Sequence, residues 1–165
     1  MHGLHLEGKW RLRSGDQTQV LVKRSGEKAS HVWLKGFLWY LYQPTFPYAQ
    51  VEKPIGHRFK PDVVAFGQAL ASYPADPPVF WAEAGQVTQQ KLASLFRQFP
   101  DCHFAVAKWG NHGPWVDLLR KIVPPGKRSA PVDLLLFPED SLERFVDSSG
   151  EITLTLDQVL VLRLF

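Results

Sequence analysis

The sequence predicts an α/β fold in which a mixed β-sheet is flanked by helices and preceded by a β-hairpin. Two strand-like segments with alternating polar and apolar residues open the chain, three short strand-like segments follow a first helix, and helices and strands alternate after them. With 165 residues and 45% hydrophobic composition, the chain is long enough to bury one substantial core. We therefore expect a single domain spanning residues 1–165.

The N-terminal hairpin is predicted from residues 4–13 and 18–24, which flank the turn at residues 14–17. Polar and apolar residues alternate in both segments, and the turn contains a Gly-Asp pair. Because side chains alternate between the faces of a strand, one face of the first strand is basic. This face is either a solvated strand surface or a phosphate contact, and its members are Lys9, Arg11 and Arg13.

A helix is predicted over residues 27–42, because apolar residues recur there at helical spacing and Pro44 follows. Within it, Gly36 indicates close packing. His31 and Lys35 lie four residues apart, and we interpret both as ordinary residues of the helix surface, with a role at a site as the alternative.

The remaining elements follow from short apolar segments bounded by Pro and Gly and from amphipathic periodicity. The first three strands are predicted to form an antiparallel meander, since the link between the first two has hairpin length. The predicted strands are residues 49–55, 58–67, 78–85, 102–109, 131–137 and 151–165, and the predicted helices are residues 87–99, 114–123 and 138–145.

Several classes of protein are disfavoured by the composition. No segment approaches the roughly 18 apolar residues of a membrane helix, and the N-terminus lacks a secretory pattern, so a cytoplasmic protein without membrane contact is expected. Cys102 is the single cysteine, which rules out a cysteine-rich zinc site, and we expect it to be buried. The motifs of serine hydrolases, P-loop proteins and dinucleotide-binding proteins are absent.

Two carboxylates occupy the ends of neighbouring predicted strands. Asp62 precedes the segment VVAF, and Glu83 follows the segment VFWA. An unpaired buried charge is very costly, so each acid must be solvated, paired or bound to a cation. Mg²⁺ is commonly held by one or two carboxylates together with water and substrate phosphate. The pair therefore indicates a metal site, with an exposed aspartate at a strand end as the alternative for Asp62.

Lys91 is the candidate for a third catalytic group. It lies on the same helix row as Leu95 and Phe99, eight residues after Glu83. Its ammonium is expected to reach back toward the carboxylates, and the alternative is a lysine that covers the helix edge. Glu52, ten residues before Asp62, is either an additional metal ligand or an ordinary surface residue. Glu27 is interpreted as an acid at the helix N-terminus.

The order of these elements and acids resembles the PD-(D/E)xK nuclease superfamily, which has the restriction-endonuclease-like fold. The similarity rests on Pro61-Asp62, on Glu83-Ala84-Gly85 after an apolar strand, and on the order helix, three strands, helix, strand. Within the superfamily, the sequence is most similar to the YaeQ family, which also begins with a strand pair and a comparable helix. The resemblance covers residues 4–123 and rests more on the order of elements than on any one motif.

The resemblance implies the catalytic residues Asp62, Glu83 and Lys91, and the metal ligands Asp62 and Glu83 with Glu52 as an auxiliary. The superfamily motif has a lysine two residues after the second acid, where this chain has Gly85. In YaeQ-like proteins that lysine is replaced from the following helix, which is where Lys91 lies. This departure concerns catalysis more than the fold.

The expected activity is Mg²⁺-dependent (or Mn²⁺-dependent) hydrolysis of nucleic-acid phosphodiester bonds, and DNA is expected as the partner ahead of RNA. Phosphate contacts would come from the basic hairpin face and from Lys108, Lys127 and Arg128. One alternative is a binding module that retains the fold without turnover, in keeping with the displaced lysine and the formal charge of only +3. Another is a protein-interaction module, since six tryptophans and eleven phenylalanines offer aromatic groups for a surface.

Overall fold

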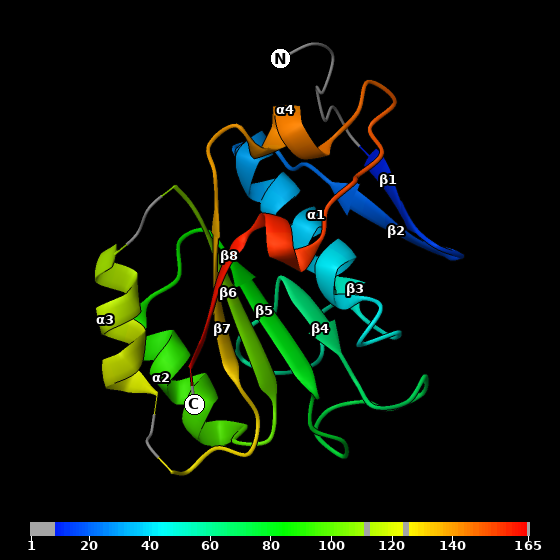
Figure 1. The fold of residues 1–165 in the computed structure, drawn as a ribbon. Helices are drawn as coiled ribbons and strands as arrows, with labels where there is room; N and C mark the ends of the chain where they lie inside the picture. Colours follow the sequence, from blue (N-terminus) through cyan, green and yellow to red (C-terminus); the bar gives the residue numbers. More distant parts are fainter. Residues whose placement is uncertain (1–8, 111–112, 124–125, 165) are drawn as a thin grey trace.

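The computed structural model describes residues 9–110, 113–123 and 126–164, and it confirms the mixed α/β architecture (Figure 1). The strands are β1 (Lys9–Ser14), β2 (Gln17–Val22), β3 (Gln50–Val51), β4 (Val63–Ala65), β5 (Phe80–Ala84), β6 (His103–Trp109), β7 (Val132–Phe137) and β8 (Leu160–Leu164). The helices are α1 (Ala29–Tyr42), α2 (Gln89–Gln98), α3 (Gly113–Ile122), α4 (Ser141–Phe145) and the 3₁₀ helix η1 (Leu156–Gln158).

The strands from β3 to β8 form one six-stranded sheet in which spatial order follows chain order. β3, β4 and β5 pair antiparallel, which confirms the predicted meander, whereas β5, β6 and β7 are parallel and β8 returns antiparallel to β7. β3 and β4 are much shorter than the predicted strands 49–55 and 58–67. Pro54 and Pro61 lack the N–H group that a ladder requires, so pairing is confined to residues before Pro54 and after Pro61.

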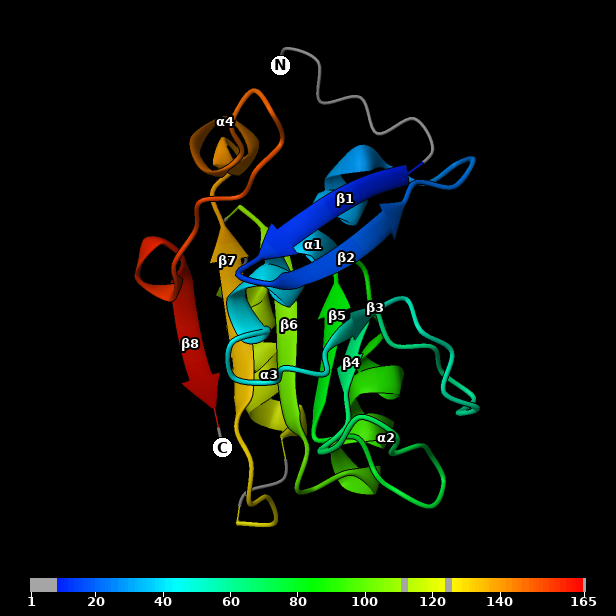
Figure 2. The ribbon, with the colours of Figure 1, turned by 90° about the vertical axis from the view of Figure 1, so that its right-hand side faces the viewer.

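The hairpin lies outside the sheet and packs on α1 (Figure 2). β1 and β2 pair antiparallel around the predicted Gly-Asp turn, with Leu12 and Leu21 buried and the basic face exposed. The expected close packing at Gly36 is confirmed. A Cβ at that position would lie 2.9 Å from Leu21 Cδ1 and 3.0 Å from Leu12 Cδ1, so only glycine allows α1 to approach the hairpin this closely.

Helix α1 is buried around most of its circumference, because the sheet covers one side and the hairpin covers another. The interpretation of Lys35 as a helix-surface residue is therefore wrong, since Lys35 is 2% exposed. The helix also begins at Ala29, so Glu27 lies before its first turn and does not act as a helix-dipole acid. Figure 1 shows α1 on one side of the sheet and α2 and α3 on the other.

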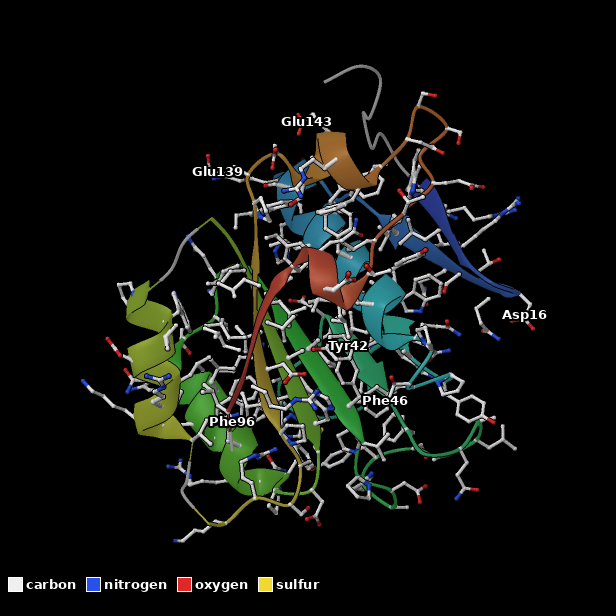
Figure 3. All side chains as sticks on the ribbon, viewed as in Figure 1. Asp16, Tyr42, Phe46, Phe96, Glu139 and Glu143 are labelled. Carbon is white, nitrogen blue, oxygen red and sulfur yellow. The ribbon has the colours of Figure 1, made fainter. Side chains whose placement is uncertain are left out.

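Two hydrophobic clusters fill the spaces on the two sides of the sheet. Alternate residues of β5 supply both of them: Phe80, Ala82 and Ala84 face α1, and Trp81 faces α2. Figure 3 shows the side chains that fill these layers, including Tyr42 and Phe46 on one side and Phe96 on the other. Because side chains alternate between the two faces of a strand, β5 supplies apolar residues to the helical layers on both sides of the sheet.

The aromatic residues fill the interior more than the surface. Among residues 9–110, 113–123 and 126–164, no tryptophan or phenylalanine is exposed, so the aromatic surface expected for a protein-interaction module is not found there. Cys102 is buried, as predicted. None of the described helices has both the length and the apolarity needed to cross a membrane.

The C-terminal segment differs from the single strand predicted for residues 151–165. It contains an isolated bridge at Ile152, the 3₁₀ helix η1 and then β8. The side chain of Gln158 reaches back to the N–H of Thr155 at 2.9 Å, which forms a capping box and turns the backbone out of the extended conformation. The apolar alternation of this segment gave no sign of that turn.

Candidate active site

The two candidate carboxylates lie at the same end of β4 and β5. Val63 pairs with Ala82, so the next position along this register places Asp62 beside Glu83. The backbone N–H of Asp62 donates to the carbonyl of Ala82 at 3.2 Å, and the N–H of Ala84 donates to Asp62 Oδ2 at 2.8 Å. The side chain of Asp62 therefore adds a hydrogen bond beyond the end of the β4–β5 ladder, and this bond holds the carboxylate against β5.

Glu83 is a buried carboxylate on the side of the sheet that faces α2. It is 4% exposed, and its Oε1 accepts a hydrogen bond from Trp81 Nε1 at 2.8 Å. Burial and the neighbouring negative charge of Asp62 raise the pKa of Glu83 to about 7, although Lys91 and Trp81 oppose this rise. A carboxylate of this kind is available for proton exchange near neutral pH.

Lys91 reaches Glu83 from the first turn of α2, as the sequence predicted. Its Nζ lies 2.8 Å from Glu83 Oε1. The helix starts at this point because Thr88 is the N-cap, and Thr88 Oγ1 accepts from the N–H of Lys91 at 3.1 Å. Lys91 is partly exposed, whereas Leu95 and Phe99 on the same row are buried, so the ammonium lies between the carboxylate and solvent.

Glu52 takes part in an ion-pair network that the sequence did not indicate. Lys35 Nζ donates to Glu27 Oε1 and to Glu52 Oε1, at 2.5 Å in each case. Burial alone would lower the pKa of Lys35, but these bonds and the nearby charge of Asp62 outweigh it and raise the pKa. Lys35 therefore stays charged inside the protein. Glu52 has a φ of 54°, a left-handed conformation that ends β3 and turns its backbone away from the strand.

Asp62 is the link between this network and the Glu83–Lys91 pair. The backbone N–H of Glu52 donates to the carbonyl of Asp62 at 2.8 Å, which continues the pairing of β3 with β4. The charge of Asp62 acts on both Lys35 and Glu83. Consequently four acids, from the segment before α1, the ends of β3 and β4, and β5, form a single electrostatic unit with one lysine from α1 and one from α2.

Lys108 is a further cation beside the candidate site. It is 4% exposed on β6, and its Nζ donates to the carbonyl of Gly85, two residues beyond Glu83. The same Nζ lies 3.7 Å from the centroid of the Trp115 ring. Burial lowers the pKa of Lys108 to about 8, and the charge of Glu83 opposes this change only in part. Sequence reasoning placed Lys108 among surface phosphate contacts, whereas the structure buries it next to the catalytic candidates.

The other basic candidates have different surroundings. Lys9, Arg11, Arg13 and Lys127 are exposed, as a phosphate contact requires. Arg128 is not available in this way, because its guanidinium donates to the carbonyls of Phe96 at 2.9 Å and Phe99 at 3.2 Å and also to that of Cys102. Arg128 thus satisfies carbonyl groups at the C-terminal end of α2, and its expected phosphate contact is a wrong prediction.

A second polar cluster lies at the opposite end of the sheet and was missed by sequence reasoning. Asp133, on β7, is fully buried and accepts from Tyr42 Oη at 2.7 Å and Arg163 Nε at 2.8 Å, and it lies 2.6 Å from His103 Nε2. Burial alone would raise the pKa of Asp133, but these bonds outweigh it and lower the pKa. The four residues come from distant parts of the chain, and only the aspartate in an apolar strand was a signal.

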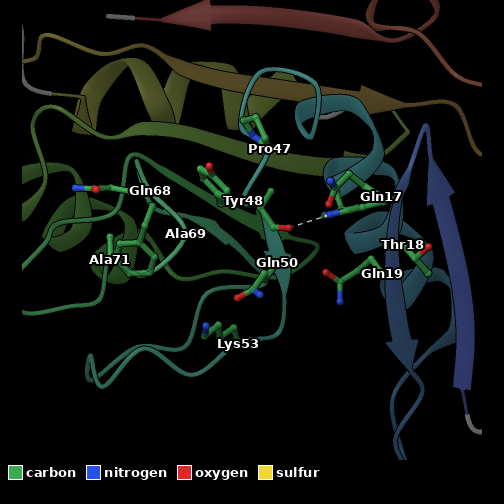
Figure 4. A pocket seen from close by; sticks show the side chains of 13 residues that line it. Gln17, Thr18, Gln19, Pro47, Tyr48, Gln50, Lys53, Gln68, Ala69 and Ala71 are labelled. Atoms are coloured by element: carbon green, nitrogen blue, oxygen red, sulfur yellow. Dashed lines mark hydrogen bonds between the residues drawn. The ribbon is translucent and has the colours of Figure 1, made fainter.

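Two hollows adjoin the candidate active site, and another lies apart from it. The first, of about 780 Å³, is lined by Lys91, Lys108 and Trp115, and the second, of about 430 Å³, is lined by Glu27 and His31. The separate hollow, of about 270 Å³, lies between the hairpin and the segment around β3 (Figure 4). No carboxylate is among its described lining residues, which makes it a poor candidate for metal-dependent chemistry.

The donor set fits a hard cation better than zinc. The described part of the chain contains no group of three or more His, Cys, Asp or Glu residues that would hold a metal ion. Asp62 and Glu83 nevertheless offer oxygen ligands, and the hydrogen bonds of the described residues use Oδ2 of the first and Oε1 of the second. One oxygen of each carboxylate is left for a cation, and two carboxylates are the protein share of a typical Mg²⁺ site.

Comparison with known proteins establishes the fold. No protein-family model matches the chain, and no curated protein matches its sequence. Solved structures do match. Among them is the YaeQ protein from Xanthomonas axonopodis pv. citri, with a TM-score of 0.52, 12% identity and coverage of 78% of this chain and 72% of that chain. Another is the YaeQ protein from Pseudomonas syringae, with a TM-score of 0.57, 12% identity and coverage of 88% of this chain and 76% of that chain. The chain has the YaeQ fold.

The YaeQ likeness confirms the expected architecture, including the N-terminal hairpin and the mixed sheet. At 12% identity it concerns the path of the chain. The chemistry of the site has to be argued from the side chains that this YaeQ-like fold brings together.

Proposed function

We propose that this chain is a Mg²⁺-dependent nuclease of the PD-(D/E)xK type that hydrolyses phosphodiester bonds of nucleic acid. One observation carries the proposal: Asp62, Glu83 and Lys91, which are 29 positions apart at most in the sequence, meet at one end of β4 and β5. The combination of two carboxylates and one ammonium matches the requirements of phosphoryl-transfer chemistry, which are charge neutralisation and positioning.

Asp62 and Glu83 would hold the cation, through Asp62 Oδ1 and Glu83 Oε2. When bound, Mg²⁺ or Mn²⁺ supplies positive charge that offsets the charge developing on the phosphate under attack. Glu83 must be ionised to act as a ligand, and its raised pKa means that it releases a proton near pH 7 as it does so. Glu52 stays an auxiliary candidate, because its Oε1 is already engaged by Lys35.

Lys91 would contact the substrate phosphate or orient the attacking water. In the structure its ammonium is paired with Glu83, on the solvent side of that carboxylate. Because lysine has three donors and a flexible stem, the same ammonium can keep one bond to Glu83 and direct another to a phosphate. Lys35 would hold Glu52 and Glu27 in place and limit the negative charge around Asp62.

The test measures metal binding and cleavage in the same samples. Mg²⁺ or Mn²⁺ is titrated calorimetrically into the wild type, Asp62→Asn and Glu83→Gln, and each is then incubated with a mixture of DNA and RNA. Glu143→Gln is a matched control, since Glu143 is exposed on α4 (Figure 3). We expect the two site variants to lose metal binding and to cleave at least about 100-fold more slowly, while the control behaves as the wild type. Wild-type cleavage by both site variants would contradict the proposal.

A second candidate function is a nucleic-acid-binding module that retains the fold without turnover. One observation favours it. Gly85 occupies the position at which the PD-(D/E)xK motif has its lysine, and Lys91, the candidate replacement, is already paired with Glu83. For this candidate we expect nucleic-acid binding in the wild type and no cleavage at any Mg²⁺ or Mn²⁺ concentration. The absence of both binding and cleavage would exclude both functions.

A further inference from the structure

A groove lined by aromatic and basic side chains runs beside the candidate active site. We call it the tryptophan groove, and the residues that define it are Gly85, Thr88, Lys91, Lys108, Trp109 and Trp115. Its lining comes from the ends of the parallel strands β5 and β6 and from α2 and α3, which lie on the same side of the sheet (Figure 1). Ligands of α/β proteins bind at this kind of position, outside the carboxyl ends of parallel strands. Its volume of about 780 Å³ is in the range of small-molecule sites.

The groove is suited to an anion. Its described lining contains two lysines and no carboxylate. Lys91 enters from α2, and Lys108 enters from β6. The N-terminus of the ten-residue helix α2 also lies in the groove, with Thr88 as its N-cap, so the positive end of the helix dipole adds to the two ammonium groups. Lys91 joins the groove directly to Glu83, which places an anion bound here next to the proposed cleavage site.

The groove is also suited to a flat aromatic ligand. Trp109 ends β6 and is held edge-on by Phe37 and Phe137, with ring centroids 6.2 Å and 6.1 Å away. Trp115 comes from the first turn of α3, and Lys108 Nζ lies 3.7 Å from its ring centroid. A phosphate that is attracted to Lys108 therefore arrives beside an indole ring. A phosphate and an aromatic base are two of the three parts of a nucleotide, and the sugar joins them.

The groove continues past the active site. Gly85 and Trp109 also line the neighbouring hollow of about 430 Å³, which extends toward Lys28 and His31 at the start of α1. The two hollows thus share a wall at the turn that follows Glu83. A chain of nucleotides has room to lie across this turn, with one nucleotide on each side of it.

We infer that the tryptophan groove binds unpaired nucleotides, so that the substrate of this protein is single-stranded nucleic acid or the frayed end of a duplex. The inference rests on the proposed function, because it assigns the substrate class of the same site. In a duplex the faces of the bases are stacked on one another, and only an unpaired base can place its face against an indole. An acidic peptide would satisfy the lysines but would leave the tryptophans without a stacking partner.

The experiment measures binding without cleavage. A fluorescein-labelled single-stranded oligonucleotide of about eight nucleotides and a duplex of the same sequence are titrated with protein in EDTA, and anisotropy is recorded. The variants are Trp115→Leu, Trp115→Phe and Lys108→Gln. Lys121→Ala is the control, because Lys121 is exposed near the end of α3 and does not line the groove. Circular dichroism checks the folding of each variant.

We expect the wild type to bind the single strand at least about tenfold more tightly than the duplex. Stacking on an aromatic side chain contributes about 1–3 kcal/mol per base, so Trp115→Leu should weaken single-strand binding about 5-fold to 150-fold. Trp115→Phe and Lys121→Ala should stay close to the wild type, and Lys108→Gln should weaken binding and reduce its salt dependence.

Two results would overturn the inference. One is equal affinity of the wild type for the single strand and the duplex. This measurement uses only the wild type, so it does not depend on the folding of any variant. The other is equal competition by an acidic peptide, which would show recognition of charge alone. The proposed function is judged separately by cleavage in Mg²⁺. Single-strand binding without cleavage would refute the proposed nuclease activity and support the inference about the tryptophan groove. Cleavage of the duplex without a preference for the single strand would support the nuclease activity and refute the inference.

Discussion

Replacement of Glu83 by glutamine is expected to change how the stability of the protein depends on pH. The environment raises the pKa of Glu83 from its ordinary value of 4.5 to about 7. Below pH 4.5 the carboxyl group is protonated in the folded and the unfolded chain, so it has no differential effect. As the pH rises from about 4.5 to about 7, the unfolded chain releases the proton first, and the folded protein loses stability.

The magnitude follows from the size of this pKa change. A pKa difference of one corresponds to about 1.4 kcal/mol, so ionisation of Glu83 costs the folded state about 3 kcal/mol above pH 7. Glutamine does not titrate, fills almost the same volume and still accepts from Trp81 Nε1. We therefore expect the stability of Glu83→Gln relative to the wild type to be about 3 kcal/mol higher at about pH 8 than at about pH 4.

The assay is urea unfolding of the wild type, Glu83→Gln and the surface control Glu143→Gln at both pH values. The comparison between pH values removes any constant effect of the substitution on packing, and titrating groups that do not interact with Glu83 cancel because all three proteins share them. The reasoning is refuted if the relative stability of Glu83→Gln is the same at both pH values, or if it falls as the pH rises. Addition of Mg²⁺ at about pH 8 should stabilise the wild type and not Glu83→Gln, provided that the proposed metal site exists.

Three further results are expected. Lys108 should titrate at about pH 8 in ¹⁵N-detected NMR of the lysine side chains, with Lys108→Arg to assign the signal, and a midpoint in the ordinary lysine range would contradict its buried position. Gly85→Ala should destabilise the protein by about 1–3 kcal/mol in chemical unfolding, because the φ angle of Gly85 is +75° and a Cβ would lie 3.0 Å from His31 Nδ1. Adding His31→Ala should restore only part of the lost stability, and full recovery would rule out backbone strain. Asp133→Asn should lower the free energy of unfolding by about 3 kcal/mol at neutral pH and by progressively less in acid, because the pKa of Asp133 is lowered and the stabilisation by its carboxylate is lost as the pH falls. An unchanged midpoint of unfolding at pH 7 would show that the bond from Arg163 contributes nothing.

The order of elements could be read from the sequence because it depends on local pattern. Alternation around Gly15-Asp16 specified the hairpin, and the amphipathic period of residues 87–99 specified α2. Pairing within the meander was also predicted, because strands that follow one another in the chain usually pair, although the links at residues 52–62 and 66–79 are longer than expected. The ends of β3 and β4 were not, because prolines and the left-handed Glu52 stop these strands earlier than their apolar residues suggest.

The candidate site was predicted in part, for a similar reason. Asp62, Glu83 and Lys91 lie on consecutive elements, so their proximity follows from topology. Lys35 was missed because its partners, Glu27 and Glu52, come from outside the helix and meet it only in the folded chain. Lys108 was misplaced because its burial depends on Trp115 from α3, and the cluster around Asp133 includes a hydrogen bond between residues 91 positions apart. Contacts of this kind are tertiary and leave no periodic trace in the sequence.

The sequential order of the sheet also has a consequence for biosynthesis. Each strand from β4 to β8 pairs with the strand made just before it, so the sheet can grow at one edge as the chain leaves the ribosome. Helix α1 is synthesised earlier than all of these strands, yet its apolar circumference, with Trp33, Phe37 and Trp39, is covered only when the sheet exists. The hairpin, which is complete before α1 emerges, can shield one side of the helix in the meantime. Because the hairpin precedes α1 in the chain, we expect it to limit aggregation of the nascent protein at the stage when this hydrophobic helix has no other partner.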